Sequence, residues 1–144
     1  MGLFHAEFAE GQRDAEMLMD ENAVSKIVLD LCIKIHRRLG AGLLESAYER
    51  ILEIELRKAG LHVARQVAMP VIWDGVKVED AFRADLVVND IVLIELKSVA
   101  TLAPVHFTQI TTYLKVSGIR LGLLINFGQT TLKAGYHGIA NGMP

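Results

Sequence analysis

The sequence predicts one domain of the α/β or α+β class, and three observations lead to that prediction. The chain has 144 residues, which is about the size of a single domain and is enough to bury one sizeable core. Hydrophobic residues follow helical spacing over residues 22–59 and strand-like patterns over residues 62–97. A further helix and a further strand follow, and no internal repeat or low-complexity linker separates these elements.

Two helices are expected in the first part of the chain. Asn22 is a candidate N-cap for the first helix, and Gly40 is a candidate for its end. The apolar residues of this helix recur at helical spacing: Val24, Ile27, Val28, Leu31, Ile35 and Leu39. The second helix is expected over residues 43–59, where Gly60 supplies a left-handed stop.

Strands are expected to follow. Residues 62–73 are rich in β-branched side chains, and the dipeptide Asp74-Gly75 after them is typical of a hairpin turn. Phe82–Val88 and Ile91–Lys97 form a second pair of strands around Asn89-Asp90.

A short amphipathic helix between Pro104 and Gly118 and a buried strand at Leu121–Phe127 complete the expected elements. Outside them the pattern is weak. We therefore divide the chain into an N-terminal extension (1–20), one domain (21–132) and a C-terminal tail (133–144).

The composition excludes several classes of protein. Hydrophobic residues make up 51% of the chain and the net charge is only −2, so most of the chain is not disordered. No run of apolar residues is long enough to span a membrane, and no signal peptide is apparent. The single cysteine, Cys32, excludes a disulfide framework and fits a cytoplasmic setting. The near-neutral charge predicts a local rather than a broad nucleic-acid site, and the apolar surplus is compatible with a homodimer.

Three charged residues, Asp85, Glu95 and Lys97, interrupt strands that are otherwise apolar. Alternation along a strand places Glu95 and Lys97 on one face. A two-residue turn between the strands would point Asp85 away from Glu95, whereas a three-residue loop from Asn89 to Ile91 would pair them. We prefer the second register because it gathers the apolar residues on one face: Ala84, Leu86, Val88, Val92, Ile94 and Leu96. A β-bulge would serve equally well.

Converging carboxylates favour a divalent cation. Two buried carboxylates repel each other unless a cation neutralises them, and ligand sets made only of oxygen suit Mg²⁺ or Mn²⁺. Such an ion activates water and stabilises charge on a phosphate, while Lys97 could position the attacking water. The alternative is that Asp85, Glu95 and Lys97 are ordinary polar residues at strand ends.

The run Gly42-Leu-Leu-Glu45-Ser-Ala-Tyr48 resembles the motif that names the bacterial GxxExxY protein family. The resemblance covers roughly residues 21–128 in order and without gaps, and four further segments carry it: 22–26, 36–40, 82–99 and 104–127. That family is placed in the PD-(D/E)XK nuclease superfamily. The resemblance therefore implies a restriction-endonuclease-like α/β core, with a mixed β-sheet flanked by helices.

The resemblance also implies roles for individual residues. Asp85 and Glu95 would be the metal-binding acids, Lys97 the lysine of the motif, and Glu45 an additional acid from the preceding helix. The implied activity is Mg²⁺- or Mn²⁺-dependent hydrolysis of phosphodiester bonds in DNA, or less readily in RNA. The alternative function is a non-catalytic nucleic-acid-binding or regulatory module that keeps the nuclease fold.

A second motif lies on the later helix. Gln109-Ile-Thr-Thr-Tyr113 resembles the Q-x-x-x-Y element of the RecB-type branch of the superfamily. The i, i+4 spacing places Gln109 and Tyr113 on one helical face, where both could hydrogen-bond a phosphate or a water at the metal. Otherwise Tyr113 packs in the core and Gln109 is a solvated residue.

A basic cluster near the end of the first helix contains Lys34, His36, Arg37 and Arg38. It is either a small phosphate-binding patch or a solvated helix face with a capping or packing histidine. Trp73, beside the hairpin turn, either stacks on a base or packs in a core or interface.

Overall fold

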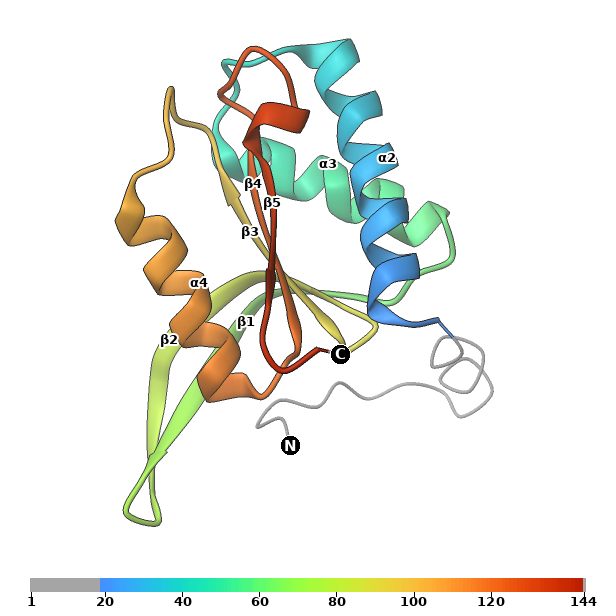
Figure 1. The fold of residues 1–144 in the computed structure, drawn as a ribbon. Helices are drawn as coiled ribbons and strands as arrows, with labels where there is room; N and C mark the ends of the chain where they lie inside the picture. Colours follow the sequence, from blue (N-terminus) through green and yellow to red (C-terminus); the bar gives the residue numbers. More distant parts are fainter. Residues whose placement is uncertain (1–18, 144) are drawn as a thin grey trace.

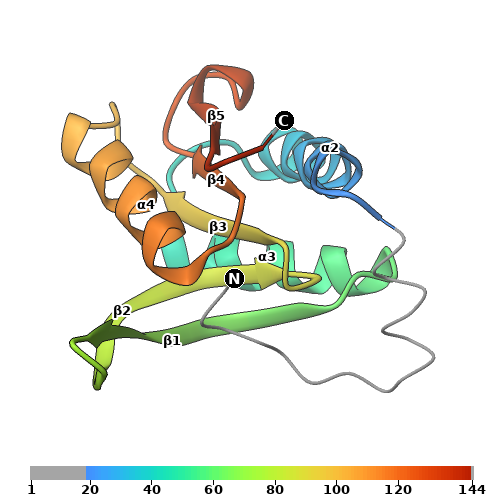
Figure 2. The same ribbon diagram turned by 60° about the horizontal axis from the view of Figure 1, so that its bottom comes forward.

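A mixed five-stranded sheet with helices on both faces forms the protein (Figure 1). The structure is a computed structural model that describes residues 19–143, so the extension predicted for residues 1–20 lies outside the described residues except at its last two positions. Helices α2 (Glu21–Leu39) and α3 (Glu45–Lys58) pack on one face and α4 (Pro104–Ser117) on the other (Figure 2). The α/β class and the mixed sheet flanked by helices are confirmed.

The strands follow one another in the sheet in the same order as in the sequence. They are β1 (Val63–Trp73), β2 (Val76–Val88), β3 (Val92–Lys97), β4 (Leu121–Asn126) and β5 (Tyr136–Ala140). Of the described neighbours, β3 and β4 run parallel and the other pairs run antiparallel. The parallel pair needs a crossover, which α4 provides. No helix within residues 19–143 is long and apolar enough to span a membrane.

Helix α2 begins before the N-cap that the sequence suggests. Asp20, rather than Asn22, caps the helix, since its Oδ1 accepts a hydrogen bond from the Ala23 N–H at 2.8 Å. A short acidic side chain at this position satisfies a free N–H group and favours the positive end of the helix dipole. The buried face of the helix lies within the predicted stripe and adds Cys32 to it.

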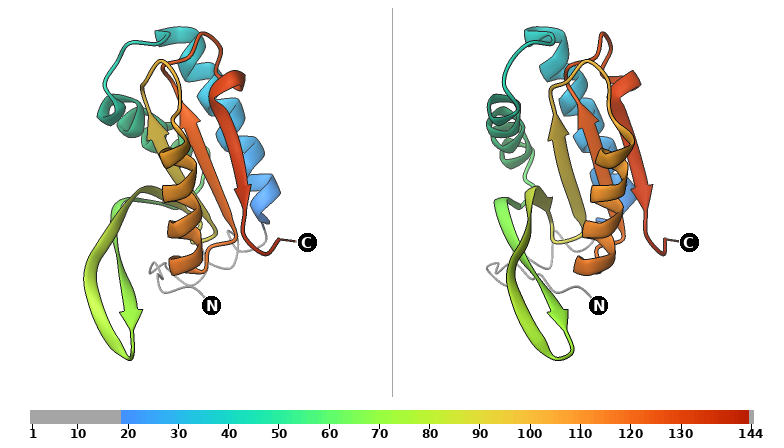
Figure 3. Two further views of the ribbon diagram at one scale, coloured as in Figure 1. Left: turned by 60° about the vertical axis from the view of Figure 1, so that its left-hand side comes forward. Right: turned by 90° about the vertical axis from the view of Figure 1, so that its left-hand side faces the viewer.

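The β1–β2 hairpin is longer than the rest of the sheet and projects beyond it (Figure 3). Its turn at Asp74 and Gly75 is confirmed, and both residues have positive φ angles, of 49° and 78°. The far half of the hairpin has apolar side chains in solvent, including Trp73, which is 70% exposed. Trp73 therefore does not pack in the core.

The β2–β3 connection confirms the predicted three-residue loop. Val88 pairs with Val92 and Leu86 pairs with Ile94, and this register brings Asp85 opposite Glu95. The predicted apolar face is correct except for Ala84, which packs with Leu93 and α4 on the opposite face. The pairing of β2 with β3 ends at Leu86, and before this residue β2 pairs with β1 in the projecting hairpin.

The C-terminal segment adds a strand that the sequence pattern did not indicate. Helix α4 begins at Pro104 and ends before Gly118, whose φ of 74° is left-handed, as predicted. Strand β4 is buried at every position. Strand β5, from Tyr136 to Ala140, then pairs antiparallel with β4, so the sheet continues past residue 132.

The chain that follows β3 is fixed to the chain that follows β4. The Asn126 Oδ1 accepts hydrogen bonds from the N–H groups of Val99 and Gly128, both at 3.0 Å, and its Nδ2 donates to the Val99 carbonyl at 2.8 Å. A Cβ on Gly128 would lie 2.2 Å from the Val99 oxygen, so only glycine fits. These contacts hold the end of β3, which carries Lys97, in place.

Candidate active site

Asp85 and Glu95 meet where β2 leaves β3, and each carboxylate binds the backbone of the other strand. The Asp85 N–H donates to Glu95 Oε1 at 3.2 Å, and the Leu96 N–H donates to Asp85 Oδ2 at 2.8 Å. These hydrogen bonds to side chains lie just beyond the last backbone pair of β2 and β3, Leu86 with Ile94. Where the two strands separate, the two carboxylates therefore lie together and take the place of backbone partners.

Each carboxylate keeps one oxygen that no backbone group satisfies. Asp85 Oδ1 has a long hydrogen bond of 3.4 Å from Gln66 Nε2. Glu95 Oε2 has no hydrogen-bond donor in the part of the chain that the structure describes. Two oxygens from adjacent strands thus remain as acceptors.

The electrostatic environment of Glu95 is unfavourable to a second negative charge. Burial raises the pKa of Glu95 to about 8, and the charge of Asp85 adds to this increase. The hydrogen bond from the Asp85 N–H and the charge of Lys97 act in the opposite direction but are weaker. Burial beside a second carboxylate thus disfavours the ionised form of Glu95, and a bound cation would offset this effect.

Lys97 is close enough to Glu95 to affect its pKa, as its place two residues further along β3 requires. Leu93 packs towards α4, so alternation places Glu95 and Lys97 on that same face. Lys97 is partly buried and has no ion pair among residues 19–143. Its ammonium group is therefore available at the site.

Tyr113 lies near the carboxylates, and Gln109 is exposed one turn earlier on α4. The Tyr113 ring stacks on Phe82 with 4.2 Å between ring centres. Burial raises the pKa of Tyr113, and the charges of Glu95 and Asp85 raise it further. No contact between Gln109 and the strand carboxylates is found among the described residues.

Glu49 of α3 is a third acid near the site, and the sequence analysis missed it. Its Oε1 accepts from Gln66 Nε2 at 2.6 Å, and its Oε2 lies 2.9 Å from Arg65 Nε. Burial is the main cause that raises the pKa of Glu49, and the charge of Asp85 adds to it. Gln66 connects Glu49 with Asp85, because its amide contacts both carboxylates.

The local backbone explains why Gln66 reaches α3. Gln66 has a φ of 52°, a left-handed conformation that is unusual for a residue with a side chain. Arg65 and Gln66, although adjacent in β1, both contact Glu49. A regular strand would point them to opposite faces. A signal for Glu49 does exist in the sequence, since it lies one helical turn after Glu45.

Glu45 lies in the first turn of α3 and is exposed. Within residues 19–143 it makes no hydrogen bond or ion pair with Asp85 or Glu95. The GxxExxY tyrosine, by contrast, is fully buried. The Tyr48 hydroxyl donates to the Gly40 carbonyl and accepts from the Leu43 N–H, so it fixes the loop before α3.

That loop is joined to the end of β3. Ser98 Oγ donates to the Leu43 carbonyl at 2.7 Å, and the Tyr48 ring stacks on Phe127 with 4.3 Å between ring centres. These contacts therefore stabilise the end of the central strand β3, which carries Lys97.

Comparison with known protein families identifies the fold. The family model described as the PD-(D/E)XK nuclease superfamily matches residues 22–139, which includes every described helix and strand except the first residue of α2 and the last residue of β5. The chain belongs to the PD-(D/E)XK nuclease superfamily. No curated protein and no solved structure matched the chain.

Superfamily members typically use divalent metals, so we tested whether these residues fit one. Within the described residues, no three acidic, histidine or cysteine side chains converge closely enough to form a complete metal site. Asp85 and Glu95 nevertheless each offer one carboxylate oxygen that no backbone group engages, and burial together with the charge of Asp85 raises the pKa of Glu95. Mg²⁺ is commonly held by one or two carboxylates, with water and substrate phosphate as the other ligands. The residues therefore fit such an ion.

Proposed function

We propose that this PD-(D/E)XK protein is a Mg²⁺- or Mn²⁺-dependent nuclease that hydrolyses phosphodiester bonds in DNA. The observation that carries the proposal is the pair of carboxylates, Asp85 and Glu95, with Lys97 on the same strand face as Glu95. The motif at Gly42, Glu45 and Tyr48 supports a closer affiliation with the GxxExxY family within the superfamily.

Each residue has a defined role in the proposal. Asp85 and Glu95 would hold the ion, which lowers the pKa of water and stabilises negative charge on a phosphate. Their reciprocal backbone bonds fix both carboxylates before substrate binds. The Lys97 ammonium donates hydrogen bonds to the attacking water and to an oxygen of the scissile phosphate. The Tyr113 hydroxyl, with Gln109 one turn earlier, supports these groups from α4.

Substitution of Lys97 tests the proposal directly. Lys97→Met keeps the length of the side chain but removes its charge and donors, so we expect DNA cleavage in Mg²⁺ or Mn²⁺ to fall by about 10²-fold or more. The measurement is the cleavage rate of labelled single- and double-stranded DNA, with RNA as a further substrate. Lys115→Met, which removes an exposed lysine from the last turn of α4, is the matched control.

Two outcomes would contradict the nuclease proposal. One is equal cleavage by the wild type, Lys97→Met and Lys115→Met, which would indicate a contaminating nuclease. The other is DNA binding by the folded wild type without cleavage in either metal. That result would favour a non-catalytic nucleic-acid-binding module with the same fold.

The additional acid from α3 needs a separate test. Glu45 is the acid that the family motif implies, whereas Glu49 is the acid that contacts Gln66 beside Asp85. We expect Glu49→Gln to lower metal affinity or cleavage by about 10- to 100-fold, since groups that orient metal ligands have effects of this size. We expect Glu45→Gln to change either quantity by less than about threefold, because exposed groups have small effects.

Calorimetric titration with Mn²⁺ and the cleavage assay would measure both variants. The opposite order of effects, with Glu45→Gln as the damaging change, would restore Glu45 as the third acid. Thermal unfolding of both variants would show whether loss of the buried Glu49 acts through stability instead.

A further inference from the structure

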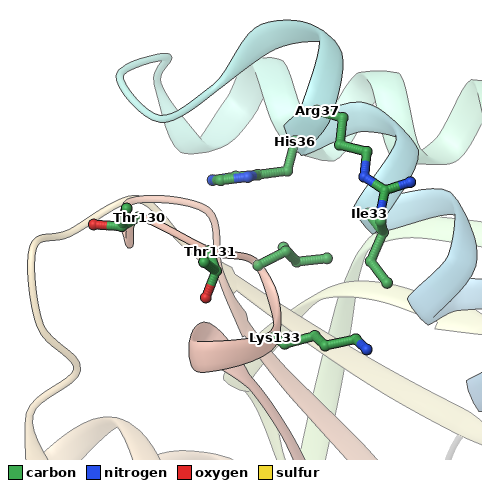
Figure 4. A pocket seen from close by; sticks show the side chains of 7 residues that line it. Ile33, His36, Arg37, Thr130, Thr131 and Lys133 are labelled. Atoms are coloured by element: carbon green, nitrogen blue, oxygen red, sulfur yellow. The ribbon is translucent and has the colours of Figure 1, made fainter.

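A cavity of about 470 Å³ lies between the C-terminal half of α2 and the segment after β4 (Figure 4). Its volume is in the range of pockets that hold small organic ligands. Its lining residues are Ile33, His36, Arg37, Thr130, Thr131, Leu132 and Lys133. None of the carboxylate or lysine residues of the candidate active site lines it.

The lining is basic and hydroxyl-rich, and it contains no acidic residue. Arg37 and Lys133 are exposed and have no ion pair among residues 19–143. Lys34, on the same helix as Arg37, is instead paired with Glu55 at 2.9 Å. The pocket thus has two uncompensated positive charges and no acidic residue in its lining, which suits an anion.

The helix dipole explains only part of this arrangement. Basic residues in the last turn of a helix are stabilised by the negative end of the dipole, and Arg37 and His36 are in that position. Lys133 belongs to a different segment, after β4, and the dipole of α2 gives no reason for it to line the same cavity. The His36 Nε2–H donates to the Gln129 carbonyl at 3.0 Å and ties this segment to α2.

A second hollow adjoins the pocket and is lined in part by the chain that follows β3. This hollow of about 330 Å³ shares Thr130 and Thr131 with the first, and its wall includes Ala100, three residues after Lys97. The Val99–Asn126 hydrogen bonds hold the chain after β3 against the start of this hollow. The two hollows are therefore contiguous at Thr130 and Thr131, and the second one reaches the segment between β3 and α4.

We propose that the Arg37–Lys133 pocket binds a phosphate group of the nucleic-acid strand that is cleaved at Asp85 and Glu95. This inference rests on the proposed nuclease function and assigns the pocket as a phosphate subsite of that substrate. The near-neutral net charge of −2 agrees with local contacts of this kind. The phosphate is either an internal phosphodiester or the terminal phosphate of the strand.

Binding measured without catalysis tests the pocket separately from the nuclease chemistry. Fluorescence anisotropy of a labelled single-stranded DNA, in the presence of a chelator, gives the dissociation constant of each variant at several salt concentrations. We expect Arg37→Ala and Lys133→Ala each to weaken binding by about three- to tenfold and to lower the salt slope by about 1. Lys115→Ala, at the far end of α4, removes the same charge and is expected to change binding by less than twofold.

The source of the phosphate is decided by three probes: DNA with a 5′-phosphate, the same DNA without it, and inorganic phosphate. Amide chemical shifts of residues 129–133 are expected to move with both DNAs if the pocket takes an internal phosphodiester. They move mainly with the phosphorylated DNA if it takes a terminal phosphate. A shift with inorganic phosphate alone, without pocket-dependent DNA binding, would overturn the assignment to nucleic acid.

The proposal fails if Arg37→Ala and Lys133→Ala weaken DNA binding no more than Lys115→Ala. Failure of the nuclease proposal would appear differently, as DNA that the wild type binds but does not cleave in Mg²⁺ or Mn²⁺. DNA binding and DNA cleavage are measured in separate experiments, so failure of the pocket proposal can be distinguished from failure of the nuclease proposal.

Discussion

Asp85→Asn is expected to lower DNA cleavage by about 10²- to 10³-fold, the size of effect seen when one preorganised electrostatic contact is removed. The substitution keeps an oxygen that can accept the 2.8 Å hydrogen bond from the Leu96 N–H. It removes the negative charge and replaces Oδ1, the oxygen of Asp85 that no backbone group engages, with an amide nitrogen. The loss should therefore come from the chemistry and not from the fold.

Asp74→Asn supplies the matched control for this variant. Asp74 undergoes the same chemical change at the exposed tip of the hairpin, where its φ of 49° also suits asparagine. The cleavage assay and thermal unfolding would be applied to both variants. Wild-type cleavage by a folded Asp85→Asn protein would remove Asp85 from the reaction and leave the carboxylate pair as a structural feature.

The position of Asp85 opposite Glu95 could be predicted from sequence, because two local rules determine it. Alternation along strands and the length of the connecting loop together fix which residues face each other. Of the two loop lengths, the three-residue loop from Asn89 to Ile91 better segregates charged from apolar residues, and the structure has that register. The hairpin turn at Asp74-Gly75 follows from equally local chemistry.

The involvement of Glu49 could not be predicted in the same way. Its contact with Gln66 depends on how α3 packs against β1, and on a left-handed residue inside a strand. Neither hydrophobic period nor residue type indicates such a residue, because most left-handed positions belong to glycine, asparagine or aspartate. Gln66, the left-handed residue of β1, contacts Asp85 of β2. Beside Asp85, β2 separates from β3, and Ala84 packs on the α4 face of the sheet and not on the predicted apolar face.

Strand β5 escaped prediction for a different reason. Its five residues include Gly138 and alternate weakly between half-buried and exposed positions. Edge strands of this kind gain their stability from backbone pairing, here with β4, and not from a strong apolar face. Pairing partners that are distant in sequence leave little trace in a local pattern.

The pH dependence of stability provides the second large expected effect. Burial and Asp85 raise the pKa of Glu95 from 4.5 to about 8 in the folded, metal-free protein. Between these values the folded state keeps a proton that the unfolded state releases, so the free energy of unfolding falls as pH rises. The stabilisation that the folded state gains from the proton on Glu95 is fully present below pH 4.5 and is lost above about pH 8. Each pKa unit corresponds to about 1.4 kcal/mol, so we expect Glu95 to cost roughly 3–5 kcal/mol at pH 9 relative to pH 4.

Glu95→Gln should remove this pH dependence. Glutamine keeps an oxygen for the Asp85 N–H but carries no charge, so the variant is expected to be the more stable protein at pH 9. Addition of Mg²⁺ or Mn²⁺ at pH 9 should then stabilise the wild type and have little effect on the variant, because the metal binds the ionised carboxylate. Urea unfolding from pH 4 to pH 9, with and without metal, would measure both effects. Glu79→Gln, on the exposed hairpin, is the matched control. Parallel pH profiles for wild type and Glu95→Gln would show that Glu95 ionises normally, and the electrostatic argument for a cation at this site would then fail.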